Sequence, residues 1–236
     1  DGSTWHLQVT GLVEQPLDLS RDALTALPAV QITRTLECIS NEVGGDLIST
    51  GVWTGVLLAD VLQRAGVRSG ASAVVFHSVD GYVETMALDK AQDPNTLLAY
   101  ALNGQPLPTK HGFPLRVLGS GTYGMKNSKW LTQIDVVAAV EPGFWEQQGW
   151  NPDAPVQTLA RIDTPKDAET VTGATSISGV AFAADRGIQR VRYRLTLARR
   201  GRTRSCCRHS ARPRGCSGIL AGNRGDPVGP PWSSAQ

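Results

Sequence analysis

The chain has 236 residues, of which 41% are hydrophobic and 19% are charged, so it can bury a substantial core. No apolar run approaches the ~18 residues of a membrane span, and Asp1 is followed by a strand-like pattern rather than a secretory signal. The composition therefore indicates a globular protein and does not encode its location.

The net charge of +2 averages two very different regions. Residues 1–191 contain 13 Lys+Arg and 20 Asp+Glu, a net charge of −7. Residues 192–236 contain ten Arg, no Lys and one acid, a net charge of +9. Three of the four cysteines also lie after residue 191, so Cys38 has no partner for a disulfide within the acidic region.

The first predicted elements lead to Cys38. Residues 4–11, "TWHLQVTG", alternate apolar and polar side chains and predict a strand. A short helix should follow, with Ser20 as its N-cap and a stop at Pro28. The alternation of residues 30–38, "VQITRTLEC", predicts another strand that brings Cys38 to a strand end, where functional residues often lie. A core hydrophobe, a catalytic nucleophile, a disulfide partner and a metal ligand are all open at this point.

The middle of the chain predicts one more helix and several strands. Residues 56–67, "VLLADVLQRAGV", have the apolar stripe of a helix that lies on a core. Residues 73–88 predict a hairpin that turns at Asp80-Gly81, and Asn103-Gly104 marks a second tight turn. A further strand is expected at residues 131–140. This order predicts a mixed, strand-rich α+β fold without repeats.

A domain boundary is expected in the Pro-, Gly- and Asp-rich residues 141–167. Residues 176–193, "SISGVAFAADRGIQRVRY", then predict two short strands of the kind that begin a β-sandwich.

The arginine-rich tail has two interpretations. Clustered arginines are typical of a nucleic-acid-binding arm. Arginine without lysine is also what a GC-rich gene gives in a wrong reading frame. One permitted set of codons for "LTLARRGRTRS", read one base earlier, gives L-D-A-G-A-A-W-P-D-A-V, which has the turn and tryptophan of a folded domain. We favour the shifted frame and assign no function, and no nucleic-acid partner, to residues 192–236.

Two glycine-containing segments carry candidate binding residues. "HGFPLR" places His111 and Arg116 five residues apart, and "GMKNSKW" offers Lys126, Lys129 and the two polar residues between them. Cationic and hydroxyl side chains on such a loop suit a phosphate or another anion, although the Walker spacing is missing. Solvated surface charge is the alternative for both lysines. The chain has no CxxC or HExxH zinc motif, and a Cys38–His111 nucleophile stays open.

Residues 5–155 resemble the molybdenum-cofactor domain of the sulfite oxidase family. The resemblance lies in "LECISN", "LISTGVWTGVLLADVLQRAG", "LLAYALNGQPLPTKHGFPLRV" and "GTYGMKNSKWL". Residues 156–191 resemble the start of the family's immunoglobulin-like dimerisation domain, and the reframed L-D-x-G-x-x-W fits a hairpin of that domain. We therefore expect a catalytic domain at 1–155 that lacks its N-terminal part, a truncated β-sandwich at 156–191, and a disordered, out-of-frame tail at 192–236.

The resemblance implies a role for each matching residue. Cys38 matches the thiolate that ligates molybdenum, which suits a soft sulfur donor. Asn41 should order the turn that follows it. The molybdenum–molybdopterin (pyranopterin) cofactor and its phosphate should be held by Asp80, His111, Arg116, Asn127, Ser128 and Lys129.

The departures from the family concern the substrate. Sulfite oxidases have arginines after the C-x-x-N motif, where this chain has Glu42 and Val43. They also have a tyrosine near the oxo group, where Trp150 is the matching catalytic-site residue here. A carboxylate repels a sulfite dianion, so a neutral or less charged oxo donor or acceptor is expected.

The resemblance implies a bacterial-type molybdenum oxidoreductase that transfers an oxygen atom in a two-electron reaction. A sulfoxide reductase of the same family and a cofactor-free binding module are the alternatives. The chain carries no haem domain, so electrons are expected to pass to a segment lost from this chain or to an external partner, a cytochrome or a membrane subunit. A homodimer and an extracytoplasmic or membrane-associated location are further expectations.

Overall fold

The structure is a computed structural model that describes residues 2–42, 44–166, 169–199, 202–211 and 218–222, with side chains described as far as residue 193. The chain divides into two compact units, residues 1–157 and 158–236. Among the described helices, none is long and apolar enough to cross a membrane.

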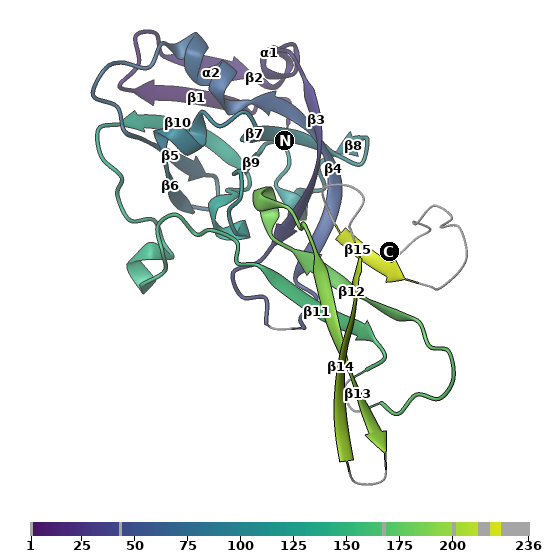
Figure 1. The fold of residues 1–236 in the computed structure, drawn as a ribbon. Helices are drawn as coiled ribbons and strands as arrows, with labels where there is room; N and C mark the ends of the chain where they lie inside the picture. Colours follow the sequence, from purple (N-terminus) through teal and green to yellow (C-terminus); the bar gives the residue numbers. More distant parts are fainter. Residues whose placement is uncertain (1, 43, 167–168, 200–201, 212–217, 223–236) are drawn as a thin grey trace. The chain divides into compact units, whose positions relative to one another are not determined.

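The first unit contains a five-stranded sheet in the order β2-β1-β10-β5-β6 (Figure 1). Neighbouring strands are antiparallel except for β1 and β10, which run parallel. The β5–β6 hairpin turns at Asp80-Gly81, which confirms the prediction, and Gly81 has a left-handed φ of 84°. The strands are β1 (His6–Gly11), β2 (Leu17–Ser20), β5 (Ala73–Ser78), β6 (Val83–Ala87) and β10 (Leu131–Val137).

A second sheet of the same unit has the order β3-β4-β7-β8, with β9 paired to β7. The turn between β7 and β8 has Asn103 at φ 51° and Gly104 at φ 75°, as a tight hairpin of the predicted type requires. The strands are β3 (Val30–Glu37), β4 (Ile48–Leu57), β7 (Leu97–Leu102), β8 (Gln105–Pro106) and β9 (Arg116–Leu118).

Strand β4 was not predicted, because Gly51 and Gly55 interrupt its alternation. The structure shows why residue 55 is a glycine. A Cβ atom there would lie 2.2 Å from the carbonyl oxygen of Leu98, so β4 and β7 approach each other more closely than a side chain allows.

The helices are short. Ser20 caps α1 as predicted, since its hydroxyl accepts a hydrogen bond from the Ala23 amide at 3.2 Å. Helix α2 buries the predicted stripe from Leu58 to Ala65 and ends at Gly66, which has φ 69°. The α-helices are α1 (Arg21–Thr25), α2 (Leu58–Ala65) and α3 (Leu88–Ala91), and the 3₁₀ helices of this unit are η1 (Thr109–His111), η2 (Gly124–Lys126) and η3 (Glu146–Gln148).

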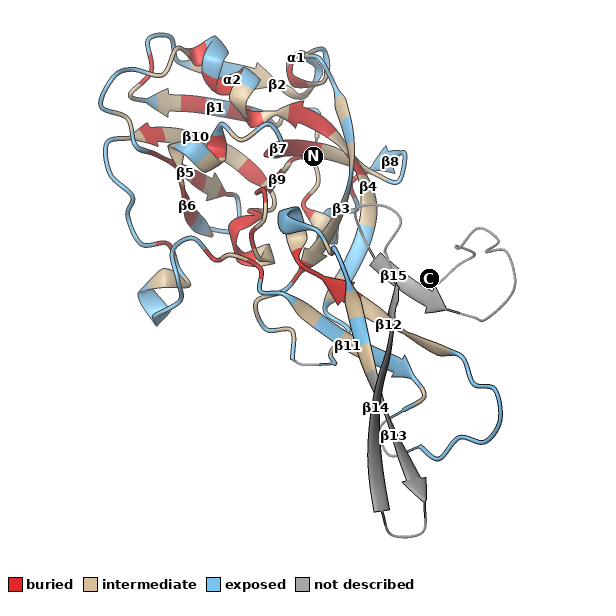
Figure 2. Ribbon diagram, viewed as in Figure 1, coloured by how far each residue is buried: buried red, intermediate tan, exposed pale blue. Residues whose placement is uncertain are grey.

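Two apolar clusters form the core of the first unit, and the buried stretches of β1, β7 and β10 stand out in Figure 2. The larger cluster joins β1, β5 and β10 to α2, and the smaller one surrounds Trp53 and Leu97. Strand β9 connects them, since Val117 belongs to the larger cluster and Leu118 to the smaller. Because its neighbours in β9 are packed in both clusters, the backbone of Arg116, the first residue of β9, is held in place.

The second unit contains a β11-β12-β15 sheet and a separate β13-β14 pair. The two strands predicted within residues 176–193 are present as β12 and the start of β13. The elements are β11 (Leu159–Thr164), β12 (Ile177–Phe182), η4 (Ala184–Arg186), β13 (Val191–Arg199), β14 (Arg202–Ala211) and β15 (Gly218–Gly222).

The predicted out-of-frame tail, residues 192–236, lies partly outside the described residues. The immunoglobulin-like character of residues 156–191 and the shifted frame of the tail both stay predictions. Inserting or removing one base near codon 193 of the gene should restore a β-sandwich sequence, and an unbroken native frame would contradict this.

Candidate functional site

Cys38 follows the last residue of β3 and is free and exposed. Its amide donates to the carbonyl of Leu47 at 2.9 Å, and its carbonyl accepts from the Asn41 amide at 3.0 Å. The backbone around the thiol is thus fixed while the sulfur faces solvent. An exposed thiol excludes the core-hydrophobe interpretation and leaves the sulfur available as a ligand.

Asn41 orders the loop after Cys38, as predicted. Its Oδ1 accepts a hydrogen bond from the Leu47 amide at 2.9 Å, and its Nδ2 donates to Oε1 of Glu37 at 3.1 Å. Glu37 is only 4% exposed, and burial raises the pKa of its carboxyl. Glu37 could not be recognised from the sequence, because a polar residue in an alternating strand normally faces solvent.

The "HGFPLR" and "GMKNSKW" segments lie against each other. The Val117 amide donates to the Ser128 carbonyl at 2.8 Å, and the Leu131 amide donates to the Leu115 carbonyl at 3.0 Å. Gly112, at φ 110°, lies close to both Lys129 and Arg116. A Cβ atom at Gly112 would lie 3.0 Å from Cβ of Lys129 and 3.2 Å from Cβ of Arg116. The two predicted binding segments therefore form one site.

The same site extends to the Cys38 loop and to the β5–β6 turn. A Cβ atom on Gly124, the first residue of η2, would lie 3.4 Å from the carbonyl oxygen of Glu37 and 3.8 Å from Cα of Cys38. On the other side, the Val79 amide donates to the Trp130 carbonyl at 3.0 Å. Asp80, next to Val79, accepts from the Tyr82 amide at 3.1 Å and interacts electrostatically with Lys129.

His111, Arg116, Ser128 and Lys129 form a group that we name the cationic cradle. Burial lowers the pKa of Arg116 to about 10, so its guanidinium stays charged at neutral pH. Burial, together with Lys110, Arg116 and Lys129, lowers the pKa of His111. Burial and then Arg116 lower the pKa of Lys129, against the opposing effect of Asp80. Each shift disfavours positive charge, and a bound anion would oppose all three by stabilising the charged forms.

Two buried polar atoms of the cradle have no protein partner among the described residues. They are Nε of Arg116 and Oγ of Ser128, a residue that is 1% exposed. The Arg116 guanidinium also lies 5.5 Å from the ring centre of Trp53, and its Nη1 donates to the His111 carbonyl at 3.3 Å. Buried donors of this kind normally have acceptors. The cradle therefore fits a phosphate-bearing cofactor, and Trp53 joins the site as a residue that no sequence pattern indicated.

Asn127, a predicted cofactor-binding residue, is 2% exposed and already bonded within the protein. Its Oδ1 accepts from the Gly119 amide at 2.5 Å, and its Nδ2 donates to the Tyr123 carbonyl at 3.2 Å. These bonds order the loop from 119 to 127. Any cofactor contact of its side chain would use the second amide hydrogen or the second lone pair of Oδ1.

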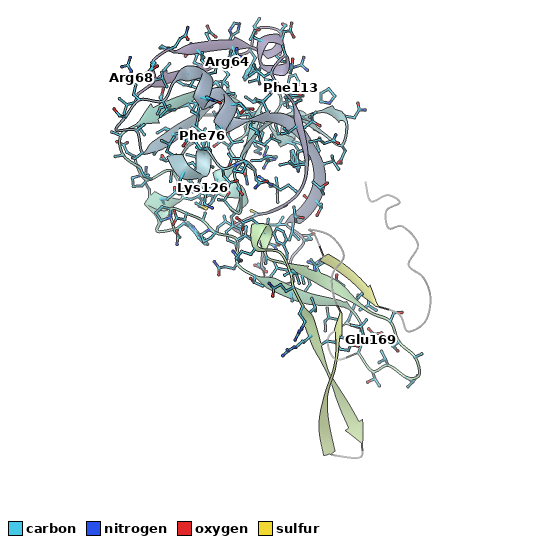
Figure 3. The ribbon with its side chains drawn as sticks, turned by 45° about the horizontal axis from the view of Figure 1, so that its top comes forward. Arg64, Arg68, Phe76, Phe113, Lys126 and Glu169 are labelled. Atoms are coloured by element: carbon cyan, nitrogen blue, oxygen red, sulfur yellow. The ribbon has the colours of Figure 1, made fainter. Side chains whose placement is uncertain are left out.

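Lys126, labelled in Figure 3, fits neither interpretation from the sequence, because it is buried and is paired with carboxylates outside the cradle. Its Nζ donates to Oε1 of Glu84 at 2.7 Å and to the Thr85 carbonyl at 2.9 Å, and it is also paired with Glu146. The side chains of Lys126, Glu84 and Glu146 are 3%, 0% and 3% exposed, and we name these three residues the carboxylate clamp.

Tyr82 completes the surroundings of the clamp. Its hydroxyl donates to Oε2 of Glu84 at 2.8 Å, and burial followed by the Glu84 charge raises the pKa of the phenol. Burial also raises the pKa of Glu84, although Lys126 opposes this. The clamp could not be predicted from a local sequence pattern, since Glu84 and Lys126 are 42 residues apart.

Trp150, the remaining predicted site residue, is 43% exposed. Its amide donates to the Trp145 carbonyl at 3.2 Å within the segment that follows β10. Glu42 is exposed in the turn after Cys38, and its carbonyl accepts from the Gly45 amide at 2.8 Å. The roles of both residues toward a substrate stay predictions.

Comparison with known proteins identifies the family. A model of the oxidoreductase molybdopterin-binding domain matches residues 1–145. The chain is 37% identical over 151 residues to the uncharacterized oxidoreductase YuiH of Bacillus subtilis, covering 64% of this chain and 74% of YuiH. It is 33% identical to the sulfite oxidase of Arabidopsis thaliana and 34% identical to the mitochondrial sulfite oxidase of Homo sapiens.

The two sulfite oxidase alignments cover 80% and 78% of this chain but only 61% and 42% of those proteins. Among solved structures, the sulfane dehydrogenase SoxCD of Paracoccus pantotrophus matches with a TM-score of 0.76 at 22% identity, over 94% of this chain and 62% of that one. This likeness supports the mixed α+β fold. From the cradle, the exposed thiol and these matches, it follows that the chain belongs to the oxidoreductase molybdopterin-binding family and is a sulfite-oxidase-like molybdenum oxidoreductase.

Proposed function

We propose that the first unit holds a molybdenum–pyranopterin cofactor and uses it in two-electron oxygen-atom transfer. The observation that carries the proposal is that one unit holds both an exposed thiol, Cys38, and a half-buried cation, Arg116, whose buried Nε lacks a protein partner among the described residues. The cofactor, when bound, supplies the oxygen-atom and electron chemistry.

The residues divide into a metal end and a phosphate end. Cys38 would supply a thiolate to molybdenum, since its sulfur is exposed at a fixed strand end. Arg116 and Lys129 would pair with the phosphate, and the Ser128 hydroxyl would donate to it. His111 and Asp80 lie beside these cations and would hydrogen-bond the polar edge of the pterin.

The substrate is expected to carry little negative charge. Glu42 is exposed in the turn after Cys38, so a sulfite dianion approaching the thiol side would meet a carboxylate. Trp150 can only donate a hydrogen bond, whereas a phenol can donate and accept. A sulfoxide fits these groups better than sulfite does. The reaction would then run as oxygen-atom removal, with the enzyme accepting electrons from a separate partner, a cytochrome or a membrane subunit.

The test is the molybdenum and pterin content of purified protein, by mass spectrometry of the metal and fluorescence of the oxidised pterin. The parent should contain both. Cys38→Ser should keep the fold, because the side chain is exposed and the change is small, yet lose turnover while keeping part of the pterin. A parent without molybdenum after expression in a cofactor-producing host would favour the non-catalytic binding module. Full activity of Cys38→Ser would show that the Cys38 thiolate is not a molybdenum ligand.

A further inference from the structure

The segment at residues 141–150, which carries Trp150, has few links to the rest of the first unit. Its backbone hydrogen bonds close within the segment, as from Gln147 to Gly143 at 3.1 Å and from Gly149 to Glu146 at 2.9 Å. Among the described polar contacts of this segment, the Glu146 carboxylate makes the one that leaves it. The aromatic ring of Phe144 adds a contact with Tyr82, with ring centres 6.5 Å apart.

The partner of Glu146 is the ammonium group of Lys126, in η2. Gly143 makes room for this pair. A Cβ atom at Gly143 would lie 2.7 Å from Oε2 of Glu146 and 2.7 Å from Oε1 of Glu84, so a side chain there would force the carboxylates apart. Because the carboxylate side chain of Glu146 is 3% exposed, its charge depends on Lys126 rather than on water.

The other end of η2 reaches the metal side of the site. Gly124 packs against the backbone of Glu37 and Cys38, two residues before Lys126 in the same turn. A short and rigid path therefore runs from the thiol loop through η2 to Lys126 and Glu146, and from there to Trp150 four residues further along the chain.

We propose that Glu146 is a positioning residue, whose ion pair with Lys126 docks residues 143–150 on η2 and thereby sets where Trp150 lies relative to Cys38. The substrate-side consequence rests on the function proposed above, whereas the docking itself does not.

The two carboxylates of the clamp provide a matched control for the experiment. Glu84 and Glu146 both pair with Lys126, but Glu84 lies in β6, which the first sheet holds by its ladder with β5. Glu84→Gln and Glu146→Gln make the same chemical change beside the same lysine, and each leaves one carboxylate in place. If the clamp only balances charge in the core, the two variants should behave alike. If Glu146 docks the segment, only Glu146→Gln should release it.

Chymotrypsin measures the release directly. The segment contains Phe144, Trp145 and Trp150 as cleavage points and has no Lys or Arg. Loss of a buried charged hydrogen bond should raise cleavage within 143–150, located by mass spectrometry, about tenfold in Glu146→Gln. Glu84→Gln and the exposed Glu141→Gln should be cleaved in this segment at the parent's rate.

The loaded enzyme supplies the second measurement. Glu146→Gln should raise KM for a sulfoxide about tenfold at nearly constant kcat and keep the parent's molybdenum content. Equal cleavage of Glu84→Gln and Glu146→Gln would overturn the docking. Release of the segment without a change in KM would overturn its consequence for the substrate. A parent that binds no molybdenum would refute the proposed function and leave the cleavage result to decide the docking. Should Glu146→Gln fail to fold, Glu146→Asp, which shortens the tether, must show the same release.

Discussion

The cationic cradle and the carboxylate clamp are built from the same loop and have opposite charge balances. In the cradle, burial and then Arg116 lower the pKa of Lys129, and the buried Nε of Arg116 and Oγ of Ser128 lack partners among the described residues. In the clamp, one lysine has two carboxylates. Lys126 and Lys129 are three residues apart, yet Lys126 is paired with two buried carboxylates, whereas Lys129 donates to the Lys110 carbonyl at 3.3 Å and has the Asp80 charge nearby without a described ion pair. A site with more cationic side chains than carboxylates indicates a bound anion. A lysine that is already paired with carboxylates indicates a structural role.

The largest effect should come from Lys126. Lys126→Met leaves two buried carboxylates without their cation, which should lower the free energy of unfolding by about 3 to 5 kcal/mol. Urea unfolding of cofactor-free protein measures this. Lys129→Met is the matched control, since its ammonium is only partly buried, and it should cost less than about 1 kcal/mol. A similar decrease in the free energy of unfolding for Lys126→Met and Lys129→Met would contradict the contrast between the clamp and the cradle.

Arg116 should show the reverse pattern. Arg116→Met keeps an apolar stem on Trp53 and removes the guanidinium, so the stability of cofactor-free protein should change little. The affinity for the cofactor should fall about tenfold or more, because a charge-assisted hydrogen bond to phosphate is lost. Pterin content after purification measures it. Unchanged pterin content would assign Arg116 a structural role, like that of Lys126.

A smaller effect is expected at Glu42, whose exposed carboxylate we predict to lie on the substrate side. Glu42→Gln should lower KM for sulfite about threefold at low ionic strength, with the difference shrinking as salt is added. KM for methionine sulfoxide or dimethyl sulfoxide should stay the same. Efficient sulfite turnover by the parent, unaffected by Glu42→Gln, would contradict the charge argument.

The smallest effect concerns His111. Its pKa is lowered in the folded protein, so the unfolded chain binds more protons as the pH falls through the unfolded value of about 6.5. The melting temperature of cofactor-free protein should therefore fall slightly as pH falls through that range. His111→Asn should flatten this part of the profile, and added inorganic phosphate should restore stability at the lower pH. A profile identical in parent and His111→Asn would show that the cradle does not act on His111.

Short sequence patterns predicted much of the fold, because each depends on nearby residues. The Ser20 cap, the Asp80-Gly81 turn and the α2 stripe are of this kind. Strand β4 escaped prediction because its glycines serve a distant partner, the β7 backbone. Side-chain alternation inside one strand carries no information about such an approach.

The candidate site divides in the same way. Cys38 and the cradle residues lie in motifs that resemble a known family, and the structure brings His111, Arg116 and Lys129 together through Gly112. Lys126 could not be separated from Lys129 by sequence, because which lysine turns inward depends on Glu84 and Glu146. Ion pairs between distant segments are a property of the packed molecule and have no local pattern.

The contact of Gly124 with the Cys38 loop also limits the size of what the site can hold. Lys129 comes five residues after Gly124, and a fully extended chain spans at most about 3.5 Å per residue, or about 17 Å over these five steps. Since Gly124 lies against Cys38, the thiol and the phosphate-binding end cannot be much further apart than this. A ligand that spans both ends has a fixed maximum length, and one added residue in this loop would change the length of ligand that fits.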